Sequence, residues 1–418
     1  FNVHTSLSVD DDRWTKNLLL ELDYFGKKLK KRTLISVFFG GGTPSLMKPS
    51  SIEKILAKIS NYWNINEDIE ISLEANPINT ELRLLQDFRS SGINRLSIGV
   101  QSLNNNALVF LGRQHDVAEA IQTIKAAEKI FSNYSFDLIY ALPNQSIKNW
   151  RRELNEALTL AGNHMSLYQL TIEKGTPFAR RKIKLPNDNL CAQFYEETQD
   201  IMENKKMYAY EISNHSRLGS ECIHNLNYWE GGDYFGIGPG AHGRFTINET
   251  FFSTYQTYDP NTWLKMVEAK GHGTAKCKNM GRKERSEELL MVGLRTRKGI
   301  NFAKFHRLTQ SSLKNLVNQD QLKDWAENLF KKNSFNMVNV SAKKETFRRA
   351  LASGKIYVGE KVFNMIKNNE MPKGDPVSLA EVSAVLGVKK TSELIPLCHP
   401  LPIDHTATKI VMHDADNS

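Results

Sequence analysis

Residues 34–45 read LISVFFGGGTPS, a short apolar run that ends directly in three consecutive glycines. The stretch SIEKILAKISNYW that follows at 51–63 carries apolar side chains at helical spacing. This order of apolar run, polar or glycine-rich end and helical stretch recurs along the chain, with apolar runs at 34–39, 69–73, 95–100, 136–142 and 165–172. Alternation at this pace predicts an α/β fold of βαβ units, as a partial barrel or an open sheet.

The composition is that of a globular chain. At roughly 100–200 residues per domain, 418 residues predict about two to four domains. An apolar fraction of 40% with 24% charged residues excludes a disordered or collagen-like chain. Four cysteines are too sparse for a secreted disulfide framework, and no two of them are spaced as CxxC or CxxxC: Cys191, Cys222, Cys277 and Cys398.

The net charge of +9 is compatible with plain solubility or with anionic ligands, and it requires no nucleic-acid partner. No apolar stretch approaches the ~18–20 residues that span a bilayer, so we expect no membrane span. The first residues, FNVHTSLSVDDDRW, are polar and acidic, unlike a signal peptide. We therefore expect a cytoplasmic protein. The chain opens at Phe1 rather than Met, as if cut from something longer.

The glycine run Gly40–Gly42 precedes Thr43 and follows a predicted strand directly. Glycines let backbone groups approach a ligand that side chains would exclude. The dinucleotide fingerprint GxGxxG fails, because Ser45 occupies its third glycine position, and the P-loop fails because no GK[ST] follows. A tight turn without a ligand is the alternative interpretation.

Polar side chains stand at or just after the ends of successive predicted strands. One such residue is usually a solvated turn or a helix cap, but four in succession predict a site: Glu74, Gln101, Arg113 and Asp137. Carboxylates accept hydrogen bonds from ribose hydroxyls or an amino group, and an arginine pairs with a carboxylate in a bidentate fork. Together they suit a ligand with an amino-acid end and a nucleoside end.

Three histidines and a cysteine occur close together in the glycine-rich stretch 208–245: His215, Cys222, His224 and His242. Their spacing matches no zinc pattern, so a metal site is the weaker interpretation. The sequence thus offers no metal-ligand set of its own.

Several motifs resemble the oxygen-independent coproporphyrinogen oxidase-like branch of the radical S-adenosylmethionine superfamily, above all its haem chaperones. They occur in the family's order across about residues 1–330: FFGGGTPS, EANP, RLSIGVQS, GRQH, FDLIYALP, YEISNHS, HNLNYW and GIGPGAH. The resemblance implies a partial (β/α)6 barrel over 1–245, with its first strand missing, and a helical C-terminal region over 246–333. It also implies a porphyrin or haem partner, with His215 or His242 as a candidate axial ligand.

The same resemblance implies S-adenosylmethionine as a cofactor. Gly41, Gly42 and Thr43 match the residues that meet its methionine part. The family's other contacts with this cofactor match the four strand-end residues: Glu74, Gln101, Arg113 and Asp137.

The sequence departs from this family at the iron–sulfur cluster. In this family the three cysteines of a CxxxCxxC motif ligate a [4Fe–4S] cluster. An electron from that cluster cleaves S-adenosylmethionine. No such motif occurs in the chain, and we expect the cluster cysteines and the first strand just upstream of Phe1. The chain as given is therefore expected to perform no radical chemistry.

From about residue 336 the motifs change. VSAKKET, KGD and KKTSELIPLCHPL resemble the N-terminal half of cyclic pyranopterin monophosphate synthase, over 336–418. The resemblance implies an incomplete ferredoxin-like α+β domain, a homo-oligomer and a cyclised GTP derivative as substrate, with the remaining half expected beyond Ser418. Lys373 and His399 match active-site positions, whereas packing is the alternative for Cys398–His399, because adjacent side chains on an extended chain point opposite ways.

Three functional interpretations follow from these motifs. The first is a coproporphyrinogen oxidase-like haem chaperone fused to a partial molybdenum cofactor module. The second is a cyclic pyranopterin monophosphate synthase, a lyase, with the first region as a passenger. The third is binding of haem or a nucleotide without turnover. The first ranks highest, because its motifs cover most of the chain.

Overall fold

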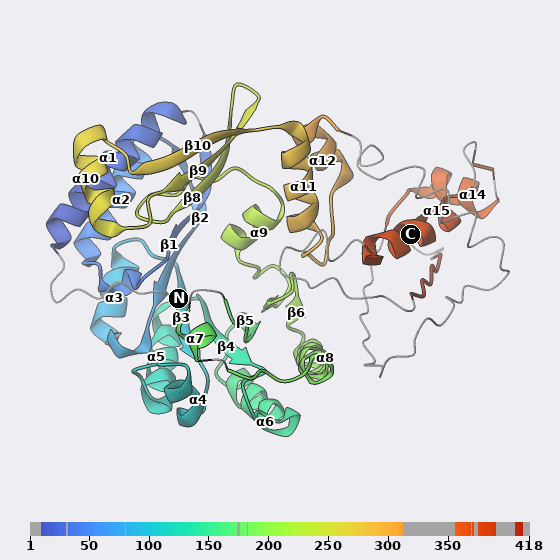
Figure 1. Cartoon of the computed structure of the whole chain (residues 1–418), viewed down its shortest axis with the longest axis horizontal. Helices are drawn as coiled ribbons and strands as arrows, with labels where there is room; N and C mark the ends of the chain where they lie inside the picture. Colours follow the sequence, from blue (N-terminus) through green and yellow to red (C-terminus); the bar gives the residue numbers. More distant parts are fainter. Residues whose placement is uncertain are drawn as a thin grey trace. The chain divides into compact units, whose positions relative to one another are not determined.

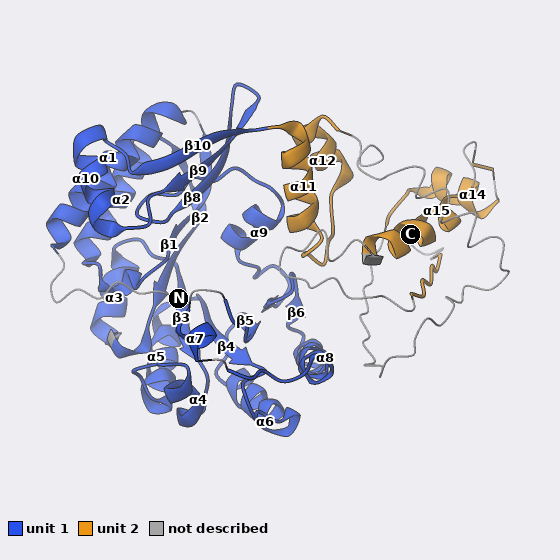
Figure 2. Cartoon of the chain, in the orientation of Figure 1, with its two compact units in different colours: residues 1–280 blue, residues 281–418 orange. Residues whose placement is uncertain are grey.

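The computed structural model describes residues 10–30, 32–79, 81–173, 176–181, 183–311, 356–368, 370–371, 375–389 and 406–412. The chain divides into two compact units, Phe1–Met280 and Gly281–Ser418, which are coloured separately in Figure 2. No helix among the residues described is long and apolar enough to cross a membrane.

The first unit is built on a curled seven-stranded sheet (Figure 1), whose strand order is β1-β2-β3-β4-β5-β7-β6. The first five strands run parallel and coincide with the five apolar runs of the sequence, so the predicted βαβ arrangement is confirmed. The last two strands are paired in antiparallel fashion: β7 pairs with β5, and β6 pairs with β7. The strands are β1 (Thr33–Phe39), β2 (Asn64–Ala75), β3 (Arg95–Gln101), β4 (Asn133–Tyr140), β5 (His164–Gln169), β6 (Tyr208–Ala209) and β7 (Asn214–Ser216).

Helices join successive strands, and side-chain caps fix the first turn of several of them. Asp116 and Glu119 form a reciprocal capping box at the start of α5, and Ser146 caps α6. The helices and short 3-10 turns of this unit are α1 (Asp11–Lys28), η1 (Pro44–Leu46), α2 (Pro49–Ser60), η2 (Pro77–Asn79), α3 (Leu82–Ser90), α4 (Asn105–Phe110), α5 (Val117–Ile130), α6 (Ile147–Leu158), α7 (Pro177–Arg180), α8 (Asp188–Asn204), α9 (Ile223–Trp229) and α10 (Pro260–Lys270).

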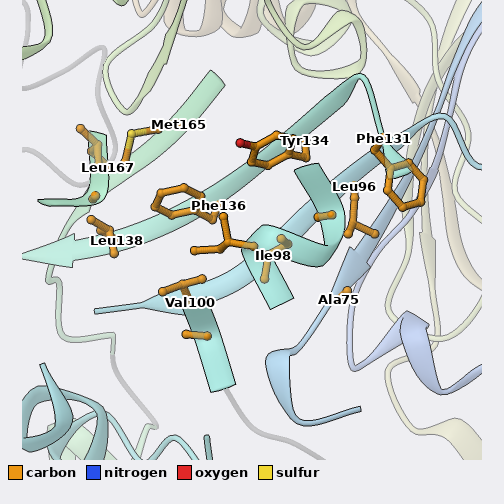
Figure 3. Close-up of a cluster of buried hydrophobic side chains, with 14 of the residues drawn as sticks. Ala75, Leu96, Ile98, Val100, Phe131, Tyr134, Phe136, Leu138, Met165 and Leu167 are labelled. Atoms are coloured by element: carbon orange, nitrogen blue, oxygen red, sulfur yellow. The ribbon is translucent and has the colours of Figure 1, made fainter. Parts of the chain in front are cut away.

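The main apolar core lies between the sheet and these helices (Figure 3). Successive side chains of a strand point to opposite faces, so every second residue meets the helices. On β3 these are Leu96, Ile98 and Val100, and Phe136 and Leu138 continue the layer on β4. The residues between them, such as Arg95 and Gln101, are polar and buried on the opposite face. The sheet therefore encloses a polar interior.

A second, three-stranded antiparallel sheet of order β10-β9-β8 completes the first unit. Its strands are β8 (His242–Ile247), β9 (Thr250–Gln256) and β10 (Thr274–Met280). Phe245 and Phe252 on one of its faces stack together, and Phe245 packs edge-on against Phe25 of α1. That face belongs to an apolar cluster with Trp63 and Leu22.

The regular structure described in the second unit is helical. Its helices are α11 (Arg282–Gly293), α12 (Phe302–Thr309), α14 (Glu360–Lys367) and α15 (Pro376–Lys389). The first two fall in the stretch 246–333 that was expected to be helical, but that stretch also contains the strands β9 and β10 of the second sheet. Lys373 and His399 lie outside the described residues, as do Cys398 and Lys390. The expected ferredoxin-like domain stays a prediction, because most of its residues are not described.

A fully buried carboxylate ties α1 to the second sheet. Glu21 accepts hydrogen bonds from the backbone N–H of Gly238 (2.9 Å), the indole N–H of Trp263 (3.0 Å) and the backbone N–H of Gly273 (2.6 Å). Trp263 also stacks on Trp14 of α1. Because a buried carboxylate is costly unless it is hydrogen-bonded, this contact fixes the GIGPG loop against α1.

We predict that Glu21→Gln lowers the free energy of unfolding by about 1–3 kcal/mol, since the amide can no longer accept at both ends. Urea unfolding followed by circular dichroism measures the change. Glu53→Gln, at an exposed position on α2, is the matched control and should stay within about 0.5 kcal/mol of the parent. A Glu21→Gln variant as stable as the control contradicts the prediction.

Candidate functional site

The carboxyl-terminal edge of the parallel sheet carries residues in an unusual backbone conformation. Gly41 (φ 79°) and Gly42 (φ 61°) follow β1, Gln101 (φ 72°) ends β3, and Ala141 (φ 59°) follows β4. For a non-glycine residue this left-handed conformation costs about 1–2 kcal/mol. Such strain collects at functional sites, where the surrounding structure holds it in place.

The glycine loop after β1 is held by residues that follow β2. The backbone N–H of Gly41 donates to Glu74 Oε2 (3.0 Å), and Asn76 Nδ2 donates to Thr43 Oγ1 (3.3 Å). A methyl group placed on Gly41 or Gly42 would meet nothing within 4 Å, so open space adjoins the loop. Burial raises the pKa of Glu74, and the Gly41 hydrogen bond opposes the rise.

A second group of side chains converges over Gly99 of β3. A Cβ on this glycine would lie 3.0 Å from Asn76 Oδ1, 3.3 Å from an Arg113 Nη2 atom and 3.5 Å from Gln101 Nε2. Gln101 Nε2 in turn donates to Asp137 Oδ2 (2.7 Å). Only a residue without a side chain leaves room for this convergence.

The carboxyl group of Asp137 is buried, and one of its two oxygens accepts no hydrogen bond from the described residues. Burial raises the pKa of its carboxyl to about 6, and the nearby Arg113 guanidinium and the Gln101 hydrogen bond oppose that rise. Its Oδ1 atom is buried and has no hydrogen-bond partner among the residues the structure describes. An orphaned acceptor of this kind is costly unless a ligand supplies the donor.

The structure therefore brings all seven of the residues predicted for cofactor binding to one edge of one sheet. Gly41, Gly42, Thr43 and Glu74 form one group, and Gln101, Arg113 and Asp137 form the other. Asn76 touches both groups and was not singled out from the sequence, although it lies in the EANP motif. This arrangement suits a ligand with an amino-acid end and a hydroxyl-bearing end, because Arg113 can pair a carboxylate and Asp137 can accept from a hydroxyl.

The histidines of the glycine-rich stretch are dispersed. His215 is buried in β7 with its Nε2 atom 3.1 Å from Gln199 Nε2, and burial lowers its pKa to about 4. His242 is exposed on β8. Within the described ranges no group of three or more His, Cys, Asp or Glu side chains is placed to hold a metal ion.

Helix α9 is anchored by a buried ion pair that sequence reasoning missed. Glu70 of β2 lies 3.4 Å from Arg95 of β3 and accepts from the backbone N–H groups of Ile223 (3.1 Å) and His224 (3.0 Å) and from the Cys222 thiol (3.3 Å). A carboxylate at a helix N-terminus satisfies its unpaired N–H groups. His224 consequently stacks on Phe38 of β1.

The cysteines of the described part do not fit a [4Fe–4S] cluster. Cys222 is buried in the contact with Glu70, Cys191 is half-buried on α8, and Cys277 is exposed on β10. Three thiolates on one cluster would have to lie together. The described cysteines therefore cannot hold such a cluster together.

Three family models match this chain. They are the Radical SAM superfamily over residues 11–157, the HemN C-terminal domain over 281–328 and the MoaC family over 337–418. The solved structure of coproporphyrinogen III oxidase from Escherichia coli superposes with a TM-score of 0.65 at 20% identity, covering 81% of this chain and 80% of that one. The partial-barrel fold is thereby confirmed.

Curated relatives give the family. "Radical S-adenosyl methionine domain-containing protein 1, mitochondrial" of Danio rerio is 38% identical over 72% of this chain and 70% of its own length. "Heme chaperone HemW" of Haemophilus influenzae is 35% identical over 72% of this chain and 79% of its own length. The chain belongs to this family of radical SAM proteins, with a MoaC-family segment joined to its C-terminal end.

We predict that Gly99→Ala lowers the affinity for S-adenosylmethionine by about tenfold, because the added methyl displaces Asn76, Arg113 or Gln101. Equilibrium dialysis with labelled ligand measures the affinity. Gly281→Ala is the matched control, since its methyl would meet nothing within 4 Å. Unchanged affinity in Gly99→Ala would show that the ligand does not use this group.

Proposed function

We propose that the first unit binds S-adenosylmethionine at the carboxyl-terminal edge of its parallel sheet. Gly41, Gly42 and Thr43 would hold the methionine part, with Glu74 opposite them. Arg113 would pair the ligand's carboxylate, and Asp137 would accept from a ribose hydroxyl. The observation that carries this assignment is the buried, unpartnered Oδ1 atom of Asp137.

The proposed biological role is that of a haem chaperone, with haem or a porphyrin as the second ligand. Relatives that match most of the barrel are named haem chaperones. Cofactor cleavage is left out of the proposal, because the described cysteines supply no cluster site. What this chain's own residues provide is binding, orientation and partial exclusion of water.

We predict that Asp137→Asn weakens S-adenosylmethionine binding by about tenfold, the cost of one charge-assisted hydrogen bond. The parent protein needs the ionised carboxylate, so its affinity should fall below pH 6, by up to about tenfold per pH unit. The asparagine variant should lose this dependence. Isothermal titration calorimetry between pH 5 and pH 8 follows both proteins.

Titration of the ligand's own groups changes the affinity of the parent and of Asp137→Asn equally, so the difference between their pH profiles reports on Asp137 alone. Asp68→Asn, at an exposed position near the start of β2, is the control and should bind as the parent does. Equal pH profiles for the parent and Asp137→Asn would overturn the role given to Asp137.

The MoaC-family match favours a second candidate function for the C-terminal segment. There, Lys373 and His399 would act on a cyclised GTP derivative, Lys373 by binding or protonating it and His399 by binding phosphate or transferring protons. Lys389 and Lys390 suit its triphosphate. A homo-oligomer built through this segment remains a further prediction.

We predict that any cyclic pyranopterin product formed by the full chain is lost in Lys373→Ala and in His399→Ala. Product is measured by chromatography after incubation with the cyclised GTP derivative. Asp137→Asn, which alters only the barrel, should not change product formation. Product that persists in both C-terminal variants would assign the activity elsewhere.

The cellular location also belongs to this proposal. The cytoplasm expected from the sequence remains one compartment, and the relatives whose names carry the word mitochondrial offer a second. Cell fractionation with an antibody against the chain distinguishes them.

A further inference from the structure

The end of β3 contains a β-bulge at the candidate site. Ile98 of β3 pairs with Phe136 of β4, and the next pair along the strands is Gln101 with Leu138. Over this interval β3 therefore has one residue more than its partner strand. A bulge of this kind leaves backbone groups outside the ladder and turns a side chain in a new direction, and bulges are common next to active sites.

Gln101 is the residue that the bulge turns. Its backbone is left-handed (φ 72°), and its Nε2 atom donates to Asp137 Oδ2 at 2.7 Å. A residue with a side chain disfavours this backbone conformation, so it persists only where the surrounding structure fixes the chain on both sides. The contacts on the two sides of Gln101 therefore decide where its amide points.

His115 fixes the residue before Gln101. The carbonyl oxygen of Val100 accepts a hydrogen bond from His115 Nε2, and the two atoms lie 3.0 Å apart. The ring is buried, and burial lowers its pKa, so the imidazole is neutral at neutral pH. Because a carbonyl only accepts, the single ring proton is then on Nε2. His115 follows Arg113 by two positions, so this bond also holds the Arg113 segment against β3.

Glu153 of α6 fixes the residues after Gln101. Its Oε1 atom accepts from the Ser102 hydroxyl (2.5 Å) and from the backbone N–H of Leu103 (2.8 Å). The Ser102 hydroxyl oxygen in turn accepts from the backbone N–H of Asn104 (3.2 Å). Burial raises the pKa of Glu153, and its two hydrogen bonds oppose the rise. We call the contacts that His115 and Glu153 make with residues 100–103 the bulge contacts.

The bulge contacts are separate from the charged and titratable groups that face Asp137. Among the described residues these groups are the Arg113 guanidinium, from the loop before α5, and the Tyr168 hydroxyl, from β5. Gln101 adds an uncharged donor, which favours the ionised carboxylate. Loss of the Glu153 contact would therefore reach Asp137 through the amide of Gln101.

We propose that Glu153 and His115 are positioning residues, which hold the bulge so that Gln101 directs its amide to Asp137. Without them Gln101 can relax from its left-handed conformation and withdraw its donor. The orientation of Gln101 is a property of the ligand-free protein, whereas the consequence for S-adenosylmethionine rests on the proposed function. A site of this kind depends on the residues that support its ligand contacts.

The first test is the titration of Asp137 in the ligand-free full chain, followed by 13C NMR of labelled aspartate carboxyls. Asp137→Asn identifies the signal. Glu153→Ala is expected to raise the midpoint from about 6 by about half to one pH unit, because the ionised carboxylate loses a donor. Glu153→Gln should keep the parent's midpoint, since its amide oxygen can accept both hydrogen bonds.

Two further variants complete this titration. Glu156→Ala, at an exposed position on the same helix, is the matched control and should titrate as the parent does. Ser102→Ala removes the hydroxyl contact and leaves the Leu103 contact, so it should give a smaller shift in the same direction. This variant also serves if Glu153→Ala does not fold, which thermal melts establish.

The second test is S-adenosylmethionine binding by isothermal titration calorimetry at pH 7. Glu153→Ala and His115→Phe should each weaken binding by about three- to tenfold, because Asp137 is less ionised and less firmly oriented. Glu153→Gln should bind as the parent does. A purely structural role for Glu153 would lower the melting temperature without moving the Asp137 midpoint.

Each outcome decides the proposal. An Asp137 midpoint that is unchanged or lowered in Glu153→Ala overturns it. Equal shifts in Glu153→Ala and Glu153→Gln also overturn it, because they would assign the effect to the charge of Glu153 and not to its hydrogen bonds. A raised midpoint in a protein whose parent binds no S-adenosylmethionine supports the bulge contacts and overturns the proposed function alone.

Discussion

In the first unit the central parallel strands β3 and β4 are largely buried on both faces, and this burial constrains what packs around them. One face meets helices and is apolar, as Leu96, Ile98 and Val100 illustrate. The other encloses a polar interior, where every group must find a partner or remain costly. Glu70 meets this demand by pairing with Arg95 and by accepting hydrogen bonds from the first N–H groups of α9. The interior thereby positions a helix that the sheet alone would not hold.

The same demand explains the edge of the sheet. Glu74 and Asn76 hold the glycine loop, and Gln101 adopts a left-handed backbone that aims its amide at Asp137. One acceptor of Asp137 is left over. The side chains at this edge are thus held in place by one another, while Asp137 Oδ1 still lacks a hydrogen-bond donor. A binding site that is preorganised for a ligand has both properties.

The chain joins segments of two families. S-adenosylmethionine binding is proposed for the barrel, and a cyclised GTP derivative for the MoaC-family segment. The positive net charge suits the anionic GTP derivative, whereas S-adenosylmethionine, whose sulfonium and ammonium outweigh its carboxylate, must be recognised by local contacts. The two compact units separate these two proposals, so each can be tested by substitutions that leave the other unit unchanged.

The five parallel strands, the glycine loop and the strand-end residues could be predicted from the sequence, because apolar alternation and motif order are local properties of the chain. The contacts that those residues make with one another could not be predicted, because they depend on how distant segments pack. Asn76 joins the two halves of the edge, and Glu70 contacts Cys222 at 152 positions' distance along the chain. His215 is buried whereas His242 is exposed, although both were equal candidates as haem ligands. Burial and convergence depend on which elements pack together, and a linear pattern does not contain that information.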